Sequence, residues 1–262
     1  MITIIKRKIA QWKNDIEKIH ILREFLQIVL LKILSDMWAF SHLAFLGGTC
    51  LRIAFGLQRY SEDLDFSLYQ TSWYDFEHIL KKLKYDLENM WFTITMKYKI
   101  WTVQNCFVHF NALLHDLGLT RVKNQNLSIK LEIDTNPPVW FHTTNQVVND
   151  VFMFPIKIFD LPSLMAGKLH AIFFRGYDKG RDRYDLAWYL SKSIEPNQLL
   201  LKNAILQTQK DATLAQTQWK ILLKDKVQHA DFGKIRQDVK QFLMHPEEIV
   251  LLSQEHFMQL IG

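Results

Sequence analysis

Two aspartates separated by one residue, Asp63 and Asp65, have the type and spacing needed to bind a metal ion. They lie in residues 61–68, where polar and apolar residues alternate as in a β-strand. Residues two apart on a strand share a face, so the two carboxylates would stand side by side. Two such acids repel each other unless a cation lies between them, and hard divalent cations prefer oxygen ligands. The pair predicts a site for Mg²⁺ or Mn²⁺, an ion that can clamp the oxygens of a phosphoryl displacement.

A glycine pair upstream of the aspartates is the second chemical feature. Gly47 and Gly48 follow the short apolar run 43–46, and Thr49 begins a stretch, residues 49–57, with helical spacing. A Gly-Gly turn that enters a helix lets backbone N–H groups approach a polyphosphate, and the Thr49 hydroxyl adds a donor. Each feature alone is common in ordinary turns and strand edges. Their order and spacing together predict a nucleotide site.

A further carboxylate lies on a later strand. In residues 126–134, Lys130, Glu132 and Asp134 would share one face, while apolar residues take the other. Either acid could complete a metal site with Asp63 and Asp65, and the spacing does not decide between Glu132 and Asp134. The structural alternative is a solvated strand face with a Lys–Glu contact.

These motifs resemble a known family. The glycine pair followed by Asp63-Leu64-Asp65-Phe66 resembles the DNA polymerase β-like nucleotidyltransferase superfamily. The fuller string, with Arg59 and Ser61 before the aspartates, is more narrowly similar to the AbiEii/AbiGii toxins, the toxin halves of abortive-infection toxin–antitoxin pairs. Two further stretches resemble motifs of that family, residues 129–133 and residues 168–186. The resemblance covers roughly residues 40–190.

The resemblance implies roles for particular residues. Asp63, Asp65 and Glu132 would bind the metal, Glu132 being favoured because it matches the family position. Gly47, Gly48, Thr49, Ser61 and Lys168 would bind the nucleotide. The resemblance also implies catalytic roles for Lys168, which would reach a phosphate, and for Asp185, which would orient Lys168 or hold the geometry. The basic residues Arg175, Arg181 and Arg183 could steer a triphosphate or RNA, although a salt-bridged helix face explains them as well.

The predicted function is nucleotidyl transfer with a nucleoside triphosphate as substrate and Mg²⁺ or Mn²⁺ as cofactor. Some members of the family modify the 3′ end of tRNA, so the resemblance implies tRNA or another RNA as acceptor and a cognate antitoxin protein as partner. Three alternatives stay open: a small-molecule nucleotidyltransferase, an Asp-x-Asp glycosyltransferase that uses a nucleotide-sugar, and a catalytically dead nucleotide- or partner-binding module.

The elements that must position these residues form an α+β (α/β) fold. Helical spacing in residues 5–40 and 72–91 and alternation in residues 92–99, 102–110 and 126–134 predict a mixed sheet flanked by helices. After residue 160 only helix-like segments follow, with Asp160 and Pro162 as a helix start. We expect a nucleotidyltransferase-like domain with an N-terminal helix over 1–155 and a C-terminal helical bundle over 156–262.

Composition limits the setting. The chain has 262 residues and a net charge of +5, which is compatible with a polyanionic partner. Two cysteines, Cys50 and Cys106, are too few for a disulfide framework or a Cys-based zinc site. Charged residues interrupt the most apolar stretch, 25–46, and no apolar run follows the basic N-terminus. We therefore expect no membrane span, no secretory signal and a cytoplasmic location.

Overall fold

The computed structural model describes residues 1–12 and 14–262. The chain divides into two compact units, each built from three stretches. The first, the sheet unit, comprises residues 1–50, 61–137 and 145–158, and the second, the helical unit, comprises 51–60, 138–144 and 159–262. The last transition between the units lies at 158/159. The sequence pattern does not reveal that residues 51–60 and 138–144 belong with the helices.

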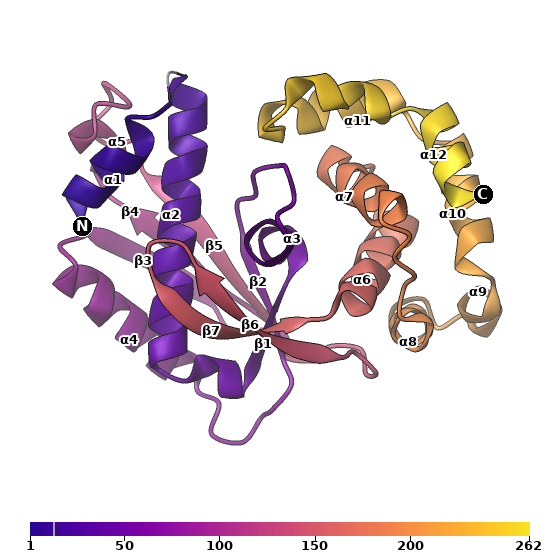
Figure 1. Ribbon diagram of the computed structural model, residues 1–262. Helices are drawn as coiled ribbons and strands as arrows, with labels where there is room; N and C mark the ends of the chain where they lie inside the picture. The colour runs from indigo at the N-terminus through magenta and orange to yellow at the C-terminus, as the bar shows by residue number, and fades with distance from the viewer. Residues whose placement is uncertain (13) are drawn as a thin grey trace. The chain divides into compact units, whose positions relative to one another are not determined.

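In the described residues, seven strands form one mixed sheet in the order β3-β4-β5-β2-β1-β7-β6 (Figure 1). β2 lies between β1, to which it is antiparallel, and β5, to which it is parallel. β4 pairs antiparallel with both β3 and β5. The strands are β1 Leu43–Leu46, β2 Leu64–Leu68, β3 Ile94–Lys99, β4 Val103–Phe110, β5 Leu127–Asp134, β6 Thr143–Asn149 and β7 Met153–Phe159.

The two faces of the sheet differ in composition. Along β5, buried and half-exposed residues alternate strictly, with Leu131 and Ile133 on the buried side and Lys130 and Glu132 on the other. We call the buried side the inner face and the side that carries Glu132 the outer face. This alternation is the two-residue period of a strand with one covered side. It places all acidic side chains of β5 on the outer face.

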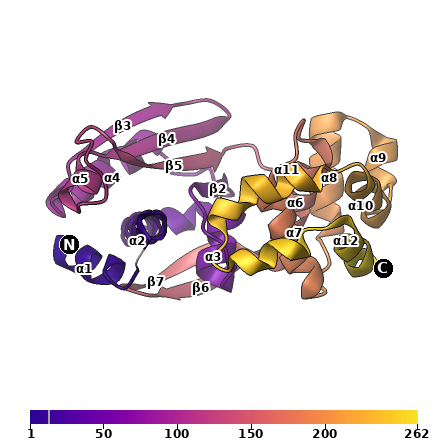
Figure 2. The same cartoon turned by 90° about the horizontal axis from the view of Figure 1, so that it is seen from above.

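Helix α2 packs on the inner face. In Figure 2 it is seen end-on, between β3, β4 and β5 on one side and β6 and β7 on the other. The side chain of Asn14 caps its start by accepting a hydrogen bond from the Ile16 amide at 2.9 Å. Most of its middle residues are buried, as expected of a helix with sheet on two sides. The helices of this unit are α1 Ile2–Ile9, α2 Asp15–Asp36, η1 Ala39–Ser41, α4 Phe76–Asn89 and α5 Leu113–Asp116, and α3 Gly47–Phe55 begins here.

Helix α6 begins as the sequence predicts. Asp160 is the N-cap of α6, its carboxylate accepting from the Ser163 amide at 2.9 Å, and Pro162 lies in the first turn. Gly180 begins α7 where a Cβ would collide with the Ile235 carbonyl of α11, so the small residue permits close packing of these helices. The helices are α6 Leu161–Phe174, α7 Gly180–Ser191, α8 Gln198–Gln209, α9 Ala212–Gln216, α10 Trp219–Gln228, α11 Phe232–Val239, η2 Lys240–Phe242, η3 Pro246–Leu251 and α12 Gln254–Ile261.

The predicted fold class, a mixed sheet flanked by helices and followed by helices, is confirmed. The sequence pattern misses β6 and β7, however. β6 is mostly exposed and polar, so it lacks an alternating apolar face. β7 contains Pro155, and a proline in a sequence argues against a strand. Among the described residues, no helix combines the length and the apolar composition that crossing a bilayer requires.

Candidate active site

The turn from β1 into α3 packs directly against a predicted metal ligand. Gly47 has a φ of +81°, a conformation that favours glycine. A Cβ at this position would collide with the carboxylate of Asp65, whose Cγ would be 3.0 Å away. Leu46 of β1 is the cross-strand partner of Asp65 in β2, which explains this proximity. The glycine turn and the acidic strand are therefore in direct contact.

Thr49 joins the same two segments by a hydrogen bond. Its side chain is fully buried, and its hydroxyl donates to the main-chain carbonyl of Asp63. The sequence suggested that this hydroxyl would bind a phosphate. The structure gives it another partner, so Thr49 fixes the start of β2 against the first turn of α3. Its backbone amide, in that first turn, remains in a position typical of anion binding by a helix start.

Glu132 lies opposite Asp65. The two residues are register partners in the parallel pair β2–β5, and Asp63 directly precedes β2. Lys130 donates to Glu132 across the outer face. Burial alone would lower the pKa of Lys130, but Glu132, Asp63 and Asp65 raise it above its usual range. The charges of all three predicted ligands thus act on one protonated lysine.

The geometry distinguishes Glu132 from Asp134, which the strand pattern alone does not. Asp134 pairs with Ser67 rather than with an aspartate, and its carboxylate accepts from the Asn136 amide at 2.9 Å at the strand end. Burial raises the pKa of Asp134, with the charge of Glu132 adding to the effect and the Asn136 hydrogen bond opposing it. Asp134 therefore ends the strand, and Glu132 is the acid closest in register to the Asp-x-Asp pair.

The donor set fits a magnesium ion shared with a substrate. Asp63, Asp65 and Glu132 offer hard oxygen donors, and their combined charge acts on Lys130. Within residues 1–12 and 14–262, no group of three or more His, Cys, Asp or Glu side chains encloses a metal position. Mg²⁺ is commonly held by one or two carboxylates together with substrate phosphates, so a closed protein cage is not required.

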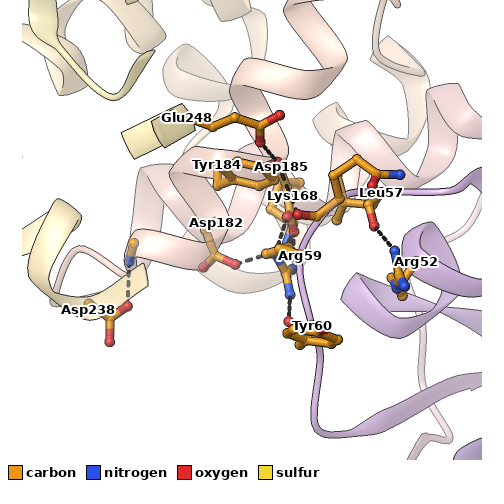
Figure 3. A network of polar contacts seen from close by, with 12 residues as sticks. Arg52, Leu57, Arg59, Tyr60, Lys168, Asp182, Tyr184, Asp185, Asp238 and Glu248 are labelled. Atoms are coloured by element: carbon orange, nitrogen blue, oxygen red, sulfur yellow. Dashed lines mark hydrogen bonds and ion pairs between the residues drawn. The ribbon is translucent and has the colours of Figure 1, made fainter. Parts of the chain in front are cut away.

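A second group of charged residues lies within the helical unit (Figure 3). Arg59 is 2% exposed and forms a bidentate pair with Asp185 of α7, with Nε–Oδ1 and Nη2–Oδ2 distances of 2.6 and 2.7 Å. Lys168 of α6 approaches Asp185 at 2.8 Å and Asp182 at 2.7 Å. Burial lowers the pKa of Lys168, but Asp185 and Asp182 outweigh this and raise it. Lys168 is therefore a fixed cation, and its predicted contact with Asp185 is present.

Asp182 is the second acid of this group. It accepts from Lys168 and from Arg175. Burial favours the protonated acid, but Lys168, Arg175 and Lys179 lower the pKa of Asp182 to about 2. The neighbouring arginines have separate partners: Arg183 pairs with Asp178 at 2.6 Å, and Arg181 lies 4.2 Å from the Phe242 ring centroid. These contacts of Arg183 and Arg181 fit the alternative explanation of the basic cluster, in which the arginines stabilise a helix face.

Sequence reasoning did not assign a role to Arg59 or to Lys130. Both stand in the motif strings, and for Lys130 the strand pattern offered only a contact with a glutamate on the same face. The segment around Arg59 also bonds to the C-terminal region: Tyr60 N donates to Phe242 O at 2.8 Å, and Tyr184 Oη donates to Gln58 O at 3.3 Å. Ser61 is half-buried, and its carbonyl accepts from Gln27 at 3.2 Å.

Neither cysteine is placed for covalent chemistry. Cys50 is fully buried, and burial together with the charge of Asp65 raises the pKa of its thiol well above the usual range. Burial likewise raises the pKa of Cys106 to about 12. Both thiols are protonated at neutral pH, as expected of cysteines in a packed core.

Comparison with known structures identifies the fold as that of a nucleotidyltransferase. A crystal structure from H. pylori, provisionally described as a nucleotidyltransferase, aligns with a TM-score of 0.52 at 21% identity, over 90% of this chain and 93% of that chain. The H. pylori protein JHP933 gives a TM-score of 0.44 at 19% identity, over 90% and 94%. No curated protein matches the chain.

The family follows from the sequence. Residues 29–258 match the family of the nucleotidyl transferase AbiEii toxin of type IV toxin–antitoxin systems. The chain therefore belongs to the AbiEii nucleotidyltransferase toxin family. The match extends well beyond residue 190, where the motif resemblance ended, so the C-terminal helices are part of the family's chain.

The first prediction concerns the contact between Gly47 and Asp65. Gly47→Ala places a methyl group in the Asp65 carboxylate, whereas Gly56→Ala, also at positive φ (+72°), meets no atom within 4 Å. Both variants carry the backbone strain of about 1–2 kcal/mol, and Gly47→Ala should lose about 1–3 kcal/mol more. Urea unfolding of the two variants measures the difference. Equal losses would show that the contact is not a constraint.

The second prediction concerns the buried ion pair. Asp185→Asn leaves the Arg59 charge buried without its counterion and should lower the free energy of unfolding by about 3–5 kcal/mol. Replacing both residues, Arg59→Met with Asp185→Asn, removes the unpaired arginine while Lys168 keeps Asp182, and should recover part of that loss. Glu88→Gln, which breaks the exposed Lys84–Glu88 pair, is the control and should change stability by less than about 1 kcal/mol. A single-variant loss as small as the control's contradicts this account.

The third prediction is a pH dependence. The folded-state pKa of Asp182, about 2, lies below its ordinary value of 3.8, so its ionised form stabilises the fold above pH 4. That contribution, about 2 kcal/mol, disappears as the pH falls toward 2. The stability gap between the wild type and Asp182→Asn should be constant above pH 5 and shrink by pH 3, as measured by denaturant titrations. A gap that widens with acid would contradict the assignment.

Proposed function

We propose that this protein transfers a nucleoside monophosphate from a nucleoside triphosphate to an acceptor hydroxyl in a metal-dependent reaction. The family supports nucleotidyl transfer over the nucleotide-sugar alternative. One structural observation carries the proposal: the Asp65 carboxylate packs against the glycine turn that begins α3. A phosphate held at the helix start and a cation held by Asp65 would then be neighbours.

The triphosphate would bind at the start of α3. Gly47 and Gly48 leave the backbone open, and the first-turn amides of a helix lack internal partners and carry partial positive charge. Thr49 keeps this turn fixed to Asp63. Ser61 is proposed as a further nucleotide contact on the basis of its place in the motif.

The metal would be held by Asp63 and Asp65, with Glu132 as third ligand. When bound, Mg²⁺ or Mn²⁺ would neutralise phosphate charge and polarise the phosphorus toward attack. Lys130, which contacts Glu132, offsets the mutual repulsion of the three acids. The lysine thereby allows carboxylates to be placed close together before substrate arrives.

The transfer step conserves atoms and charge. The acceptor oxygen forms a bond to the α-phosphorus, the bond from that phosphorus to the bridging oxygen breaks, and pyrophosphate leaves. The acceptor proton passes to a carboxylate, and Glu132 is proposed for this role from the family position. The protein mainly orients reactants and stabilises charge, which is the usual division of work in phosphoryl transfer.

Lys168 and Asp185 complete the proposed catalytic set. The raised pKa of Lys168 keeps it protonated, which supports its proposed role in offsetting phosphate charge. Asp185 acts through Lys168 and Arg59, so it is a positioning residue. The proposed acceptor is tRNA or another RNA, the proposed partner is a cognate antitoxin, and the proposed location is the cytoplasm. The net charge of +5 supports a polyanionic acceptor.

The test is transfer from each α-labelled triphosphate in turn, with Mg²⁺ and total tRNA, by wild type and Asp65→Asn. Asn keeps the size of Asp65 but loses the charge that holds the metal, so transfer should fall by at least about a hundredfold. Asp116→Asn, on the exposed α5 carboxylate, is the matched control and should keep full activity.

The labelled product identifies the acceptor. Label in tRNA that Asp65→Asn abolishes supports the proposal and names the base. Label in a small molecule would support nucleotidyl transfer but show that the acceptor is not an RNA. Transfer by Asp65→Asn at the wild-type rate would overturn the proposed function. So would the absence of transfer to any acceptor, both by protein purified alone and by protein from which an antitoxin has been removed.

A further inference from the structure

The outer face of the sheet continues past the carboxylates as an exposed aromatic surface. On β4, Val103 and Phe107 are 40% and 39% exposed, whereas Cys106 on the inner face is fully buried. The turn after β3 adds Ile100 and Trp101, which are 52% and 74% exposed. Clustered exposed apolar residues of this kind mark binding surfaces more often than isolated ones do. Helix α4 packs on the opposite, inner face, where Tyr74 Oη donates to Gln104 at 2.5 Å.

Phe107 and His109 form a prepared pair of rings. Their planes are within 9° of parallel, and their centroids are 6.2 Å apart. The Nδ1 atom of His109 is hydrogen-bonded to the Ser128 hydroxyl at 2.6 Å, which fixes the imidazole. Lys130 lies 6.0 Å from the centroid of the Phe107 ring. Rings held in place without a ligand lose little conformational entropy when a flat partner binds.

Lysines of β3 flank these rings on one side, whereas the acids of the outer face, Glu132 and Asp134, lie on β5. Lys97 and Lys99 are exposed on β3, and their register partners on β4 are Phe107 and Asn105, so both lysines belong to the outer face. The sequences of β3 and β4 contain no aspartate or glutamate. Aromatic rings flanked by lysines on an open sheet match what single-stranded nucleic acids require, stacking for bases and positive charge for phosphates. An acidic protein would need the lysines but not the ordered rings.

This surface is continuous with the candidate active site. Cross-strand register gives the row Lys97, Phe107 and Lys130, and the next strand, β2, is preceded by Asp63. Neighbouring strands are about 4.8 Å apart, so Phe107 lies two strands, or about 10 Å, from the strand of the metal-binding acids. A chain whose terminal hydroxyl reaches the acids would pass over these rings.

We propose that the outer face of β3, β4 and β5 binds the unpaired 3′ end of a polynucleotide acceptor, with a base stacked on Phe107 and its phosphates near Lys97 and Lys99. The identity of this strand as acceptor rests on the proposed function, whereas its binding does not. Stacking accepts any base, so the surface selects single strands without reading sequence.

Binding is measured by fluorescence anisotropy with a short, unstructured, labelled oligoribonucleotide, in EDTA and without triphosphate. Phe107→Leu keeps the apolar volume and removes the ring, while Phe107→Tyr keeps the ring. The Leu variant should bind about tenfold more weakly than wild type, and the Tyr variant should bind like wild type. Tyr85→Ala, an aromatic residue 61% exposed on α4, is the matched control and should bind normally.

The charged part is tested separately. Replacing Lys97 and Lys99 with Gln should reduce the dependence of affinity on salt concentration. Wild-type affinity in Phe107→Leu, or absence of polynucleotide binding by the wild type, would overturn the proposal. Because this assay involves no transfer, the two proposals fail independently: label can reach RNA without Phe107-dependent binding, and Phe107-dependent binding can exist without transfer.

Discussion

The Asp65 carboxylate occupies the place where any side chain at residue 47 would have to be. Under the proposed function, this contact places the turn that would hold the phosphates beside the acid that would hold the cation. It demands glycine on one strand–helix turn and fixes the register of β1 against β2. The Thr49–Asp63 hydrogen bond ties the same segments at a second point. The rest of the sheet supports the glycine turn and β2.

In each of the two units, charged side chains lie beside groups of opposite charge without any ligand. Lys130 is held among three acids on the outer face, and within the helical unit Arg59 and Lys168 are held by Asp185 and Asp182. A buried ion pair of this kind contributes less to stability than to fixing position, because either partner left alone is strongly unfavourable. Such pairs keep charged groups at set places, which is what a reaction driven by charge stabilisation needs.

The sequence predicts the fold and the sheet-borne acids because both follow from local periodicity. Asp63, Asp65 and Glu132 share a face as the two-residue strand period requires, and the start of α6 at Asp160 follows from capping chemistry. Three other features are not local. The burial of Arg59 depends on a partner far along the chain, the hydroxyl of Thr49 has a partner that strand and helix patterns do not reveal, and β6 lacks an apolar face. These three features depend on contacts between residues far apart in the sequence. Helix and strand periodicity in a single sequence does not reveal such contacts.

The Arg59–Asp185 pair also has a consequence for how the protein is made. The two residues are 126 positions apart, so the ribosome emits the arginine long before its counterion exists. At about 5–20 residues per second, the wait is on the order of ten seconds. During that interval the segment around Arg59 cannot be buried as it is in the final structure. The nascent chain of this toxin therefore cannot form the Arg59–Asp185 pair until α7 has been synthesised.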